Sequence, residues 1–205
     1  MGLFTKICGI SSKEDLEQIV NLAPDAVGFI QWSKSSRYVK PETIGDWDTP
    51  KGMRRVGVFV SPNERELAHA IQYARFDTVQ VHRIPENWYA DRDFFVGIEF
   101  WNAMQPEELY FIESYFNFDR YVLDSYNPDT VGGTGKTCDW DKAAQLTKAI
   151  KKPILLAGGL NPENVTDAIL TVNPDGVDVS SGVESSPGKK DIKKIESFLS
   201  KVRNI

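Results

Sequence analysis

Eight short apolar segments recur along the chain, and they constrain its fold more than any other feature. Each has 6–7 residues rich in Val, Ile and Phe, and most end in Gly, Ser or a charged residue. Several are almost continuously apolar, which is typical of parallel strands that are covered on both faces. The predicted strands are 4–10, 26–32, 54–60, 78–83, 94–100, 120–125, 153–159 and 176–182.

Helical patterns lie between most of these strands. Their apolar side chains recur at helical spacing, and cap-forming residues precede them. Two connections fit the pattern poorly, because 40–52 does not look helical and 83–93 is short for a crossover. The predicted helical segments are 11–23, 61–74, 138–146, 161–172 and 191–203.

This alternation over 205 residues predicts an α/β protein, a (β/α)8 TIM barrel. An open, doubly wound sheet is the alternative, because it is built from the same alternation. No Ser/Gly-rich linker or charge block divides the chain, so residues 1–205 are expected to form a single barrel domain. No fixed-period repeat is visible beyond the alternation itself.

Charge and cysteine content exclude several classes of protein. The chain has 24 basic and 29 acidic residues and a net charge of −5, so nothing indicates binding to nucleic acid. No apolar run predicts a membrane span, and 1–20 lacks the apolar core of a signal peptide. Cys8 and Cys138 cannot form a disulfide framework, and we expect reduced thiols in a cytoplasmic protein.

Polar side chains at the carboxyl ends of the strands are the candidate site residues, because barrel active sites form there. A thiol, a carboxylate and a guanidinium facing one pocket would form an acid–base site with an anion clamp. The two histidines, His69 and His82, stand apart from any Cys or carboxylate cluster, so no metal site is predicted. The candidates are Lys6, Cys8, Lys34, Arg37, Gln80, His82, Glu99, Asp124 and Asp178.

Cys8 is the candidate base, although a lone cysteine in a strand is more often a small buried hydrophobe. It lies at the end of a strand near Lys6 and, in a barrel, near Arg37. Because neighbouring cations favour the thiolate, we expect a lowered pKa at Cys8. Cys138 opens a helical segment and is expected to be incidental.

The last two predicted strands lead into loops rich in Gly and Ser. In barrels, the loops after strands 7 and 8 often bind phosphate through backbone N–H groups. We therefore predict a phosphate site, with tight turns that bind nothing as the alternative. The predicted residues are Gly158, Gly159, Ser180, Ser181 and Gly182.

The segment GGTGKT at 132–137 suggests a nucleotide-binding loop, but its spacing is wrong. A P-loop needs glycine where this chain has Thr130. We instead predict that 126–137 is a glycine-hinged loop that closes over the site.

The motifs together resemble those of a known family. KICGI, DAVGFIQWSKSSRYV, VGVFV, VQVH, LDS followed by GGTGKTCDW, LAGGLNPENV and VDVSSGVESSPGKKD occur in order from residue 5 to the last helix. The set resembles the phosphoribosylanthranilate isomerases, which are TIM barrels of the phosphosugar-binding type. This resemblance implies an Amadori rearrangement of N-(5-phosphoribosyl)anthranilate in tryptophan biosynthesis, without cofactor or metal.

The resemblance also implies roles for particular residues. Asp124 would be the general acid that opens the ribose ring, and Cys8 the general base that removes the proton from C2. Arg37 would hold the anthranilate group. Gln80, His82 and Asp178 would face the substrate, and the Gly/Ser loops would hold its phosphate. The only expected partner is this small molecule, bound by a monomer or a homodimer.

This chain departs from the family pattern at two positions. Arg83 stands where the family often has glycine, and Glu99 where a basic residue is common. Both departures are expected at the mouth of the substrate site. A related phosphosugar-barrel enzyme and a barrel that binds a phosphosugar without catalysis are the competing functions, and a turnover assay separates them.

Overall fold

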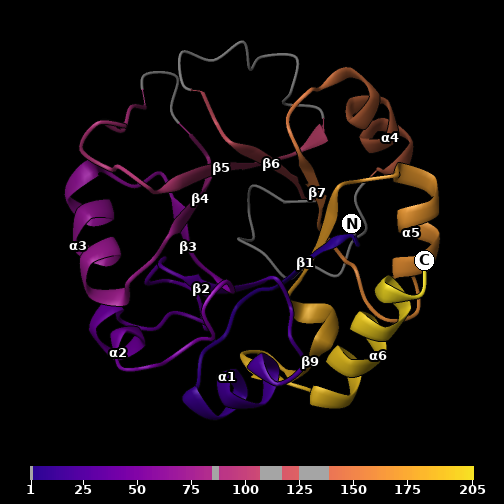
Figure 1. Ribbon diagram of the computed structural model, residues 1–205, viewed down its shortest axis with the longest axis horizontal. Helices are drawn as coiled ribbons and strands as arrows, with labels where there is room; N and C mark the ends of the chain where they lie inside the picture. Colours follow the sequence, from indigo (N-terminus) through magenta and orange to yellow (C-terminus); the bar gives the residue numbers. More distant parts are fainter. Residues whose placement is uncertain (1, 85–87, 107–116, 125–138) are drawn as a thin grey trace.

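The computed structural model describes residues 2–84, 88–106, 117–124 and 139–205 of the chain. Eight parallel strands form a closed barrel in sequence order, with β8 paired to β1 (Figure 1). The strands are β1 (Phe4–Ile7), β2 (Ala26–Ile30), β3 (Arg54–Val60), β4 (Thr78–His82), β5 (Glu99–Met104), β6 (Arg120–Leu123), β7 (Ile154–Leu156) and β8 (Gly176–Val179). The predicted barrel is therefore confirmed, and the open sheet is excluded.

The helices surround the barrel (Figure 1). After β8, a short 3-10 helix, η2 (Ser181–Val183), leads into an antiparallel hairpin of β9 (Glu184–Ser186) and β10 (Lys189–Lys190). Within the described part of the chain, no helix is long and apolar enough to cross a membrane. The α-helices are α1 (Lys13–Val20), α2 (Pro41–Gly45), α3 (Glu64–Ala74), α4 (Trp140–Ala149), α5 (Val165–Val172) and α6 (Ile192–Arg203).

Local side-chain hydrogen bonds set where the helices begin. Ser12 caps α1 as its sequence position suggests, but α3 begins after Asn63, which forms a capping box with Glu66. Asn161 accepts backbone N–H groups of the next turn, so α5 begins only at Val165. The segment expected to be non-helical contains one helical turn, α2, which starts at Pro41.

The fifth strand lies elsewhere than predicted. The sequence favoured 94–100, but residues 92–97 form a turn and β5 runs from Glu99 to Met104. Phe94 and Val96 are exposed, whereas Trp101 and Ala103 are buried inside the barrel. Both segments are rich in β-forming residues, and the barrel uses the one whose alternate side chains fill its interior.

Two apolar layers fix the direction of every strand side chain. One lies between the barrel and its helices and includes Ile7, Val79, Leu123 and Val177. The other fills the barrel and consists of Cys8, Ala26, Val56, Val58, Trp101, Ala103, Val122, Leu155 and Ala157. Because strand side chains alternate between faces, Lys6, Gln80, His82, Asp124 and Asp178 belong to the inner face.

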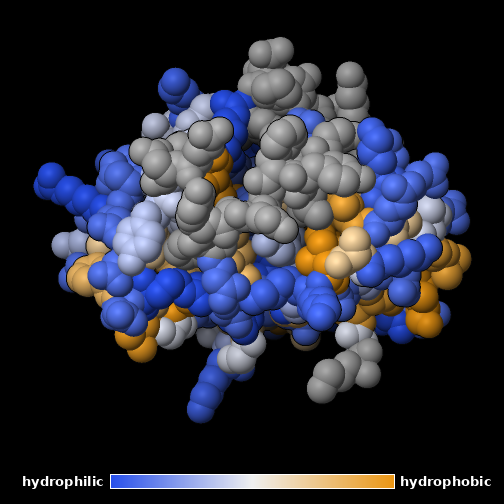
Figure 2. All heavy atoms as spheres, turned by 90° about the horizontal axis from the view of Figure 1, so that it is seen from above, coloured by the Kyte–Doolittle hydropathy of each residue, from blue (hydrophilic) through white to orange (hydrophobic). Residues whose placement is uncertain are grey.

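The outside of the molecule is more polar than these two layers. On the face that Figure 2 shows, hydrophilic residues make up most of the coloured surface, and apolar residues appear in smaller patches between them. A surface of this kind is normal for a globular protein.

Four aspartates repeat one contact around the amino-terminal face of the barrel. Each directly precedes an even-numbered strand, and its carboxylate accepts a backbone N–H from the preceding odd-numbered strand. The N–H of each aspartate also donates to the carbonyl of that same partner residue. The side-chain contacts are Asp25 to Thr5 (2.8 Å), Asp77 to Arg55 (3.1 Å), Asp119 to Phe100 (2.8 Å) and Asp175 to Ile154 (2.8 Å). We refer to these four contacts as the aspartate clamps.

Candidate active site

A buried ion pair lies beside Cys8 inside the barrel. The Lys6 ammonium donates to Asp178 Oδ2 at 2.7 Å, and their side chains are 0% and 7% exposed. Gly28 on β2 makes room for this arrangement, because a Cβ there would lie 2.8 Å from Cys8 Sγ and 3.1 Å from Lys6 Cε. The thiol and the ammonium group therefore share one wall of the barrel.

The pKa of Cys8 shifts in the opposite direction to the sequence-based expectation. Burial raises the pKa of its thiol, and this effect outweighs the opposing influence of the Lys6 charge. The predicted lowering of the Cys8 pKa is therefore wrong, because the sequence reveals neighbouring cations but not the loss of solvent. For Lys6, burial favours the neutral amine, but Asp178 and Cys8 outweigh it and raise the pKa. The cation next to the thiol is thus retained.

Gln80 and His82 lie together on the inner face of β4. Burial, with the charges of Lys6 and Arg83, lowers the pKa of His82 to about 3, so its imidazole is neutral. Gln80 Nε2 lies 3.1 Å from His82 Nε2. Because an amide nitrogen only donates, this ring nitrogen accepts and the ring proton resides on Nδ1.

Two buried oxygen atoms face the barrel interior without a partner among the described residues. They are Oε1 of Gln80 and Oδ1 of Asp178. Buried acceptors are normally hydrogen-bonded, so these two oxygens are available to a donor from water or from a bound molecule.

Asp124 directly follows β6. Its backbone N–H donates to the carbonyl of Met104 at 2.9 Å, which extends the β5–β6 pairing by one residue. Val122 faces the interior and Leu123 faces the helices, so alternation places Asp124 on the inner face. The side chain is partly exposed. Asp124 therefore lies at the carboxyl end of the barrel, as predicted.

The two predicted phosphate loops lie against each other. Gly158 and Gly159 have φ values of +77° and +66°, which few other residues adopt. Gly182, in the loop after β8, packs so closely on the loop after β7 that a Cβ would lie 1.9 Å from the Leu160 carbonyl oxygen. The structure thus brings together two loops that are more than 20 residues apart in the sequence.

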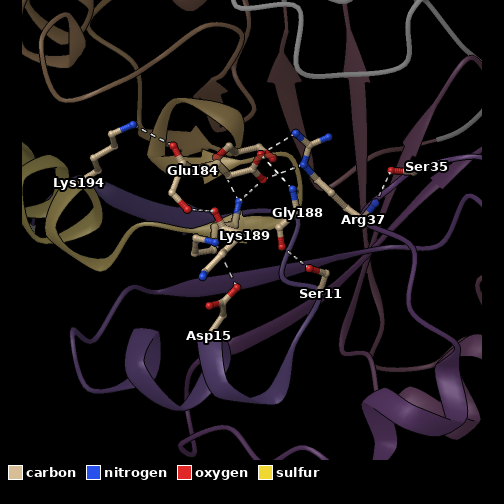
Figure 3. Close-up of polar contacts among 11 residues, drawn as sticks. Ser11, Asp15, Ser35, Arg37, Glu184, Gly188, Lys189 and Lys194 are labelled. Atoms are coloured by element: carbon tan, nitrogen blue, oxygen red, sulfur yellow. Dashed lines mark hydrogen bonds and ion pairs between the residues drawn. The ribbon is translucent and has the colours of Figure 1, made fainter.

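Arg37 reaches the same end of the barrel from the loop after β2. Its guanidinium group makes two hydrogen bonds of 2.7 Å with the buried carboxylate of Glu184, at the start of β9 (Figure 3). Lys190 Nζ donates to the same carboxylate at 3.0 Å and to the Ser180 carbonyl at 3.1 Å. Sequence reasoning assigned no role to Glu184 or Lys190, although both lie in the quoted motif VDVSSGVESSPGKKD.

Both departures from the family pattern have a structural explanation. Glu99 begins β5 and pairs with Arg54 at the amino-terminal face, so placing it at the substrate mouth was wrong. Arg83 does follow β4 at the carboxyl end and has a φ of +53°, a conformation that favours glycine.

Not every candidate joins the site. Lys34 is exposed on the loop after β2, and His69 is half-exposed on α3, where it pairs with Glu42. The expected closing loop 126–137 and Cys138 lie outside the described residues.

Comparisons with known proteins agree with this geometry. A family model described as "N-(5'phosphoribosyl)anthranilate (PRA) isomerase" matches residues 5–201. A protein of Thermoanaerobacter sp. (strain X514) named N-(5'-phosphoribosyl)anthranilate isomerase is 39% identical over 204 residues, covering 98% of each chain. A crystal structure of phosphoribosyl anthranilate isomerase from Thermotoga maritima superimposes with a TM-score of 0.87 at 35% identity, covering 99% of this chain and 100% of that one.

A second structure of such an isomerase was solved in complex with reduced 1-(o-carboxyphenylamino)-1-deoxyribulose 5-phosphate. It superimposes with a TM-score of 0.83 at 32% identity, covering 99% of this chain and 100% of that one. Both structures extend over the whole barrel rather than a part of it.

Proposed function

The chain belongs to the N-(5'-phosphoribosyl)anthranilate isomerase family, and from this premise we propose which of its groups carry out the reaction. The enzyme is an aldose–ketose isomerase of tryptophan biosynthesis. It converts N-(5-phosphoribosyl)anthranilate to 1-(2-carboxyphenylamino)-1-deoxyribulose 5-phosphate.

We assign the general acid to Asp124 and the general base to Cys8. Asp124 donates its proton to the ring oxygen of the ribose, the bond between this oxygen and C1 breaks, and the nitrogen lone pair forms an iminium at C1. The Cys8 thiolate then removes the proton from C2, which neutralises the iminium and gives an enolamine. The Cys8 thiol then returns its proton to C1 while the C2 hydroxyl loses its own proton, which gives the ketone. The hydroxyl proton restores Asp124 to its acid form, so both groups end as they began and no external oxidant or reductant is needed.

The observation that carries this proposal is the position of Cys8 beside the buried Lys6–Asp178 pair. Burial raises the pKa of the thiol, so the thiolate, once formed, is a stronger base than an exposed one. The Lys6 ammonium stabilises that thiolate electrostatically. A base of this kind is suited to removing a proton from carbon next to a cationic iminium.

The remaining predicted residues serve binding in this proposal. The free oxygens of Gln80 and Asp178 accept hydrogen bonds from ribose hydroxyl groups. Neutral His82 orients the Gln80 amide and transfers no proton, because its pKa of about 3 keeps it uncharged. Arg37 holds the anthranilate group.

The two adjoining loops hold the phosphate through backbone N–H groups. Gly182 and the neighbouring Gly158–Gly159 turn let the backbone approach the phosphate oxygens closely, and Ser180 and Ser181 complete the cradle.

We also propose that residues 1–205 act as one barrel domain, in the cytoplasm, as a monomer or homodimer. Support for the cytoplasm is the biosynthetic role of the family.

A turnover assay tests the function directly. The substrate carries a fluorescent anthranilate group, and purified protein is expected to remove this fluorescence with saturable kinetics. A wild-type protein that binds the substrate but leaves its fluorescence unchanged would overturn the assignment as an isomerase.

A further inference from the structure

Glu184 is the centre of a buried polar cluster at the carboxyl end of the barrel. Its carboxylate accepts from Arg37 Nε and Nη2 at 2.7 Å each, from Lys190 Nζ at 3.0 Å and from the Gly188 N–H at 3.3 Å. Figure 3 shows Arg37 and Glu184 extending toward each other from separate segments of the chain. The Glu184 side chain is 4% exposed, so these contacts replace its hydration.

The Arg37 side chain passes close to the residue that follows the proposed base. Its side chain crosses Gly9, where a Cβ would lie 2.7 Å from Arg37 Cδ and 2.9 Å from Ser180 Oγ. Gly9 directly follows Cys8, and Ser180 belongs to the proposed phosphate loop. Arg37 therefore lies between the reacting end of the site and its phosphate end.

Glu184 engages one edge of the planar guanidinium group and leaves the other available. Nε and Nη2 are both hydrogen-bonded to the carboxylate, whereas Nη1 has no hydrogen bond to any residue that the structure describes. A bidentate contact of this kind fixes the orientation of the whole group, because the fork is rigid. Nη1 is thus presented in one direction.

The basic side chains of the cluster outnumber its central carboxylate, which suits a site that binds an anion. The hydrogen bonds that Arg37 donates to the Glu184 carboxylate raise the pKa of Arg37. Burial alone would raise the pKa of Glu184, but Arg37 and Lys190 outweigh it and lower that pKa. One carboxylate therefore faces two cations, and the nearby Asp15 carboxylate accepts the backbone N–H of Lys190 rather than its ammonium group.

We propose that Glu184 is a positioning residue that sets specificity for the substrate's ring carboxylate, by holding Arg37 so that Nη1 meets that carboxylate. This inference rests on the proposed function and deepens it, because it names the part of the substrate that the cluster recognises. Loss of Glu184 frees the Arg37 side chain to adopt other rotamers. The guanidinium charge remains, but its fixed direction is lost.

The test compares two substrates in the wild-type enzyme and in Glu184→Gln. One is N-(5-phosphoribosyl)anthranilate, and the other is N-(5-phosphoribosyl)aniline, which lacks the ring carboxylate. For the carboxylated substrate, we expect Glu184→Gln to raise KM about tenfold or more, the size of one charge-assisted hydrogen bond, with most of the loss in KM rather than kcat. For the aniline substrate, the KM of the variant is expected to stay within about twofold of wild type.

A double-mutant cycle shows whether Glu184 acts through Arg37. Arg37→Met is expected to raise KM for the carboxylated substrate, and adding Glu184→Gln to it should raise KM no further. A further increase of about tenfold in the double variant would show an independent role and overturn the proposal.

Lys194→Met is the matched control. Lys194 Nζ donates to the backbone carbonyl of Glu184 at 2.8 Å, so this variant loosens the same residue without touching its carboxylate. It is expected to leave the KM values for both substrates unchanged. The inhibition constant of ribose 5-phosphate provides a second control, because this compound occupies the ribose and phosphate parts of the site but lacks the anthranilate group.

The outcomes separate this proposal from the broader one. If the wild type does not turn over the carboxylated substrate, the proposed function fails. If the wild type is active but Glu184→Gln raises KM equally for both substrates, or raises it for neither, the positioning role is overturned. If Glu184→Gln does not fold, Glu184→Asp takes its place, because the shorter side chain keeps the negative charge but no longer reaches Arg37. If neither variant folds, Glu184 has a purely architectural role and the proposal is overturned.

Discussion

Lys6 and Asp178 are direct register partners on β1 and β8, and their side chains form a 2.7 Å ion pair at the point where the barrel closes. A buried ion pair contributes little to stability by itself, because desolvation offsets most of its attraction. Its value here lies in keeping a full positive charge next to Cys8. That charge favours the thiolate and the burial of the thiol opposes it, so the pH at which Cys8 ionises depends on the balance between them.

Replacement of Cys8 by Ala is expected to lower kcat by about 10²-fold or more, because general base catalysis is typically worth 10²–10⁴-fold. Binding of reduced 1-(o-carboxyphenylamino)-1-deoxyribulose 5-phosphate, measured by calorimetry, should change little. A variant that keeps more than about a tenth of wild-type turnover would exclude Cys8 as the base.

Replacement of Asp124 by Asn is expected to lower kcat by about 10²-fold or more with a modest change in KM, since the amide has no proton to give in the transition state. The alkaline limb of the kcat profile should also disappear if it reports loss of the Asp124 proton. A defect confined to KM would instead assign Asp124 to substrate binding.

The acid limb of the kcat/KM profile is expected to lie above the ordinary thiol pKa of about 8.5. Burial raises the pKa of Cys8, so the thiolate fraction in the free enzyme increases only at a higher pH than in an exposed thiol. Alkylation of Cys8 by iodoacetamide, followed against pH, gives an independent midpoint. A midpoint below that of free cysteine would contradict this expectation.

Each aspartate clamp is expected to stabilise the barrel. Changing Asp25 or Asp175 to Ala should lower the free energy of unfolding by about 1–3 kcal/mol, because a backbone N–H loses its partner. The Asn variants keep an acceptor oxygen and should lose less. Urea unfolding measures the difference, and Asp93→Ala, at an exposed turn position, is the matched control. Equal stability of all these variants would show that water replaces the carboxylates without loss.

Asp119 adds a pH dependence to one clamp. Burial alone would raise its pKa, but the Arg92 guanidinium and the Phe100 N–H outweigh it and lower the pKa. Stabilisation from a depressed carboxyl pKa is complete above the ordinary value of about 3.9 and is lost as the pH falls through the folded-state value. The stability difference between wild type and Asp119→Ala should therefore shrink below about pH 4 in urea titrations. A difference that stays constant into strong acid would contradict the role of ionised Asp119.

The local pattern of apolar and polar residues was sufficient to predict most of the fold and most of the polar residues at the strand ends. Apolar runs identified seven of the eight strands, and barrel geometry then placed Gln80, His82 and Asp178 on one inner surface. The fifth strand was misplaced because two neighbouring segments have similar β-forming composition, and only the packing of Trp101 inside the barrel distinguishes them.

Contacts between distant parts of the chain escaped prediction for a physical reason. Arg37 and Glu184 are 147 positions apart, and nothing near either residue indicates the other. The raised pKa of Cys8 was missed for the same reason, since burial is a property of the closed barrel. Glu99 was assigned to the wrong end of the barrel because the strand was predicted to start five residues too early. In the predicted strand Glu99 lies near the carboxyl end, whereas in the structure it is the first residue of β5.

The aspartate clamps also affect how the barrel tolerates changes in chain length. Each clamp joins one odd-numbered strand to the next even-numbered strand within two residues of backbone, so the register of that pair is fixed locally. The aspartates are separated by 52, 42 and 56 residues, so the chain between successive clamps differs in length without changing the contact. The strand pairs are therefore held at the amino-terminal face, and the loops at the opposite face can differ in length while the barrel keeps its register.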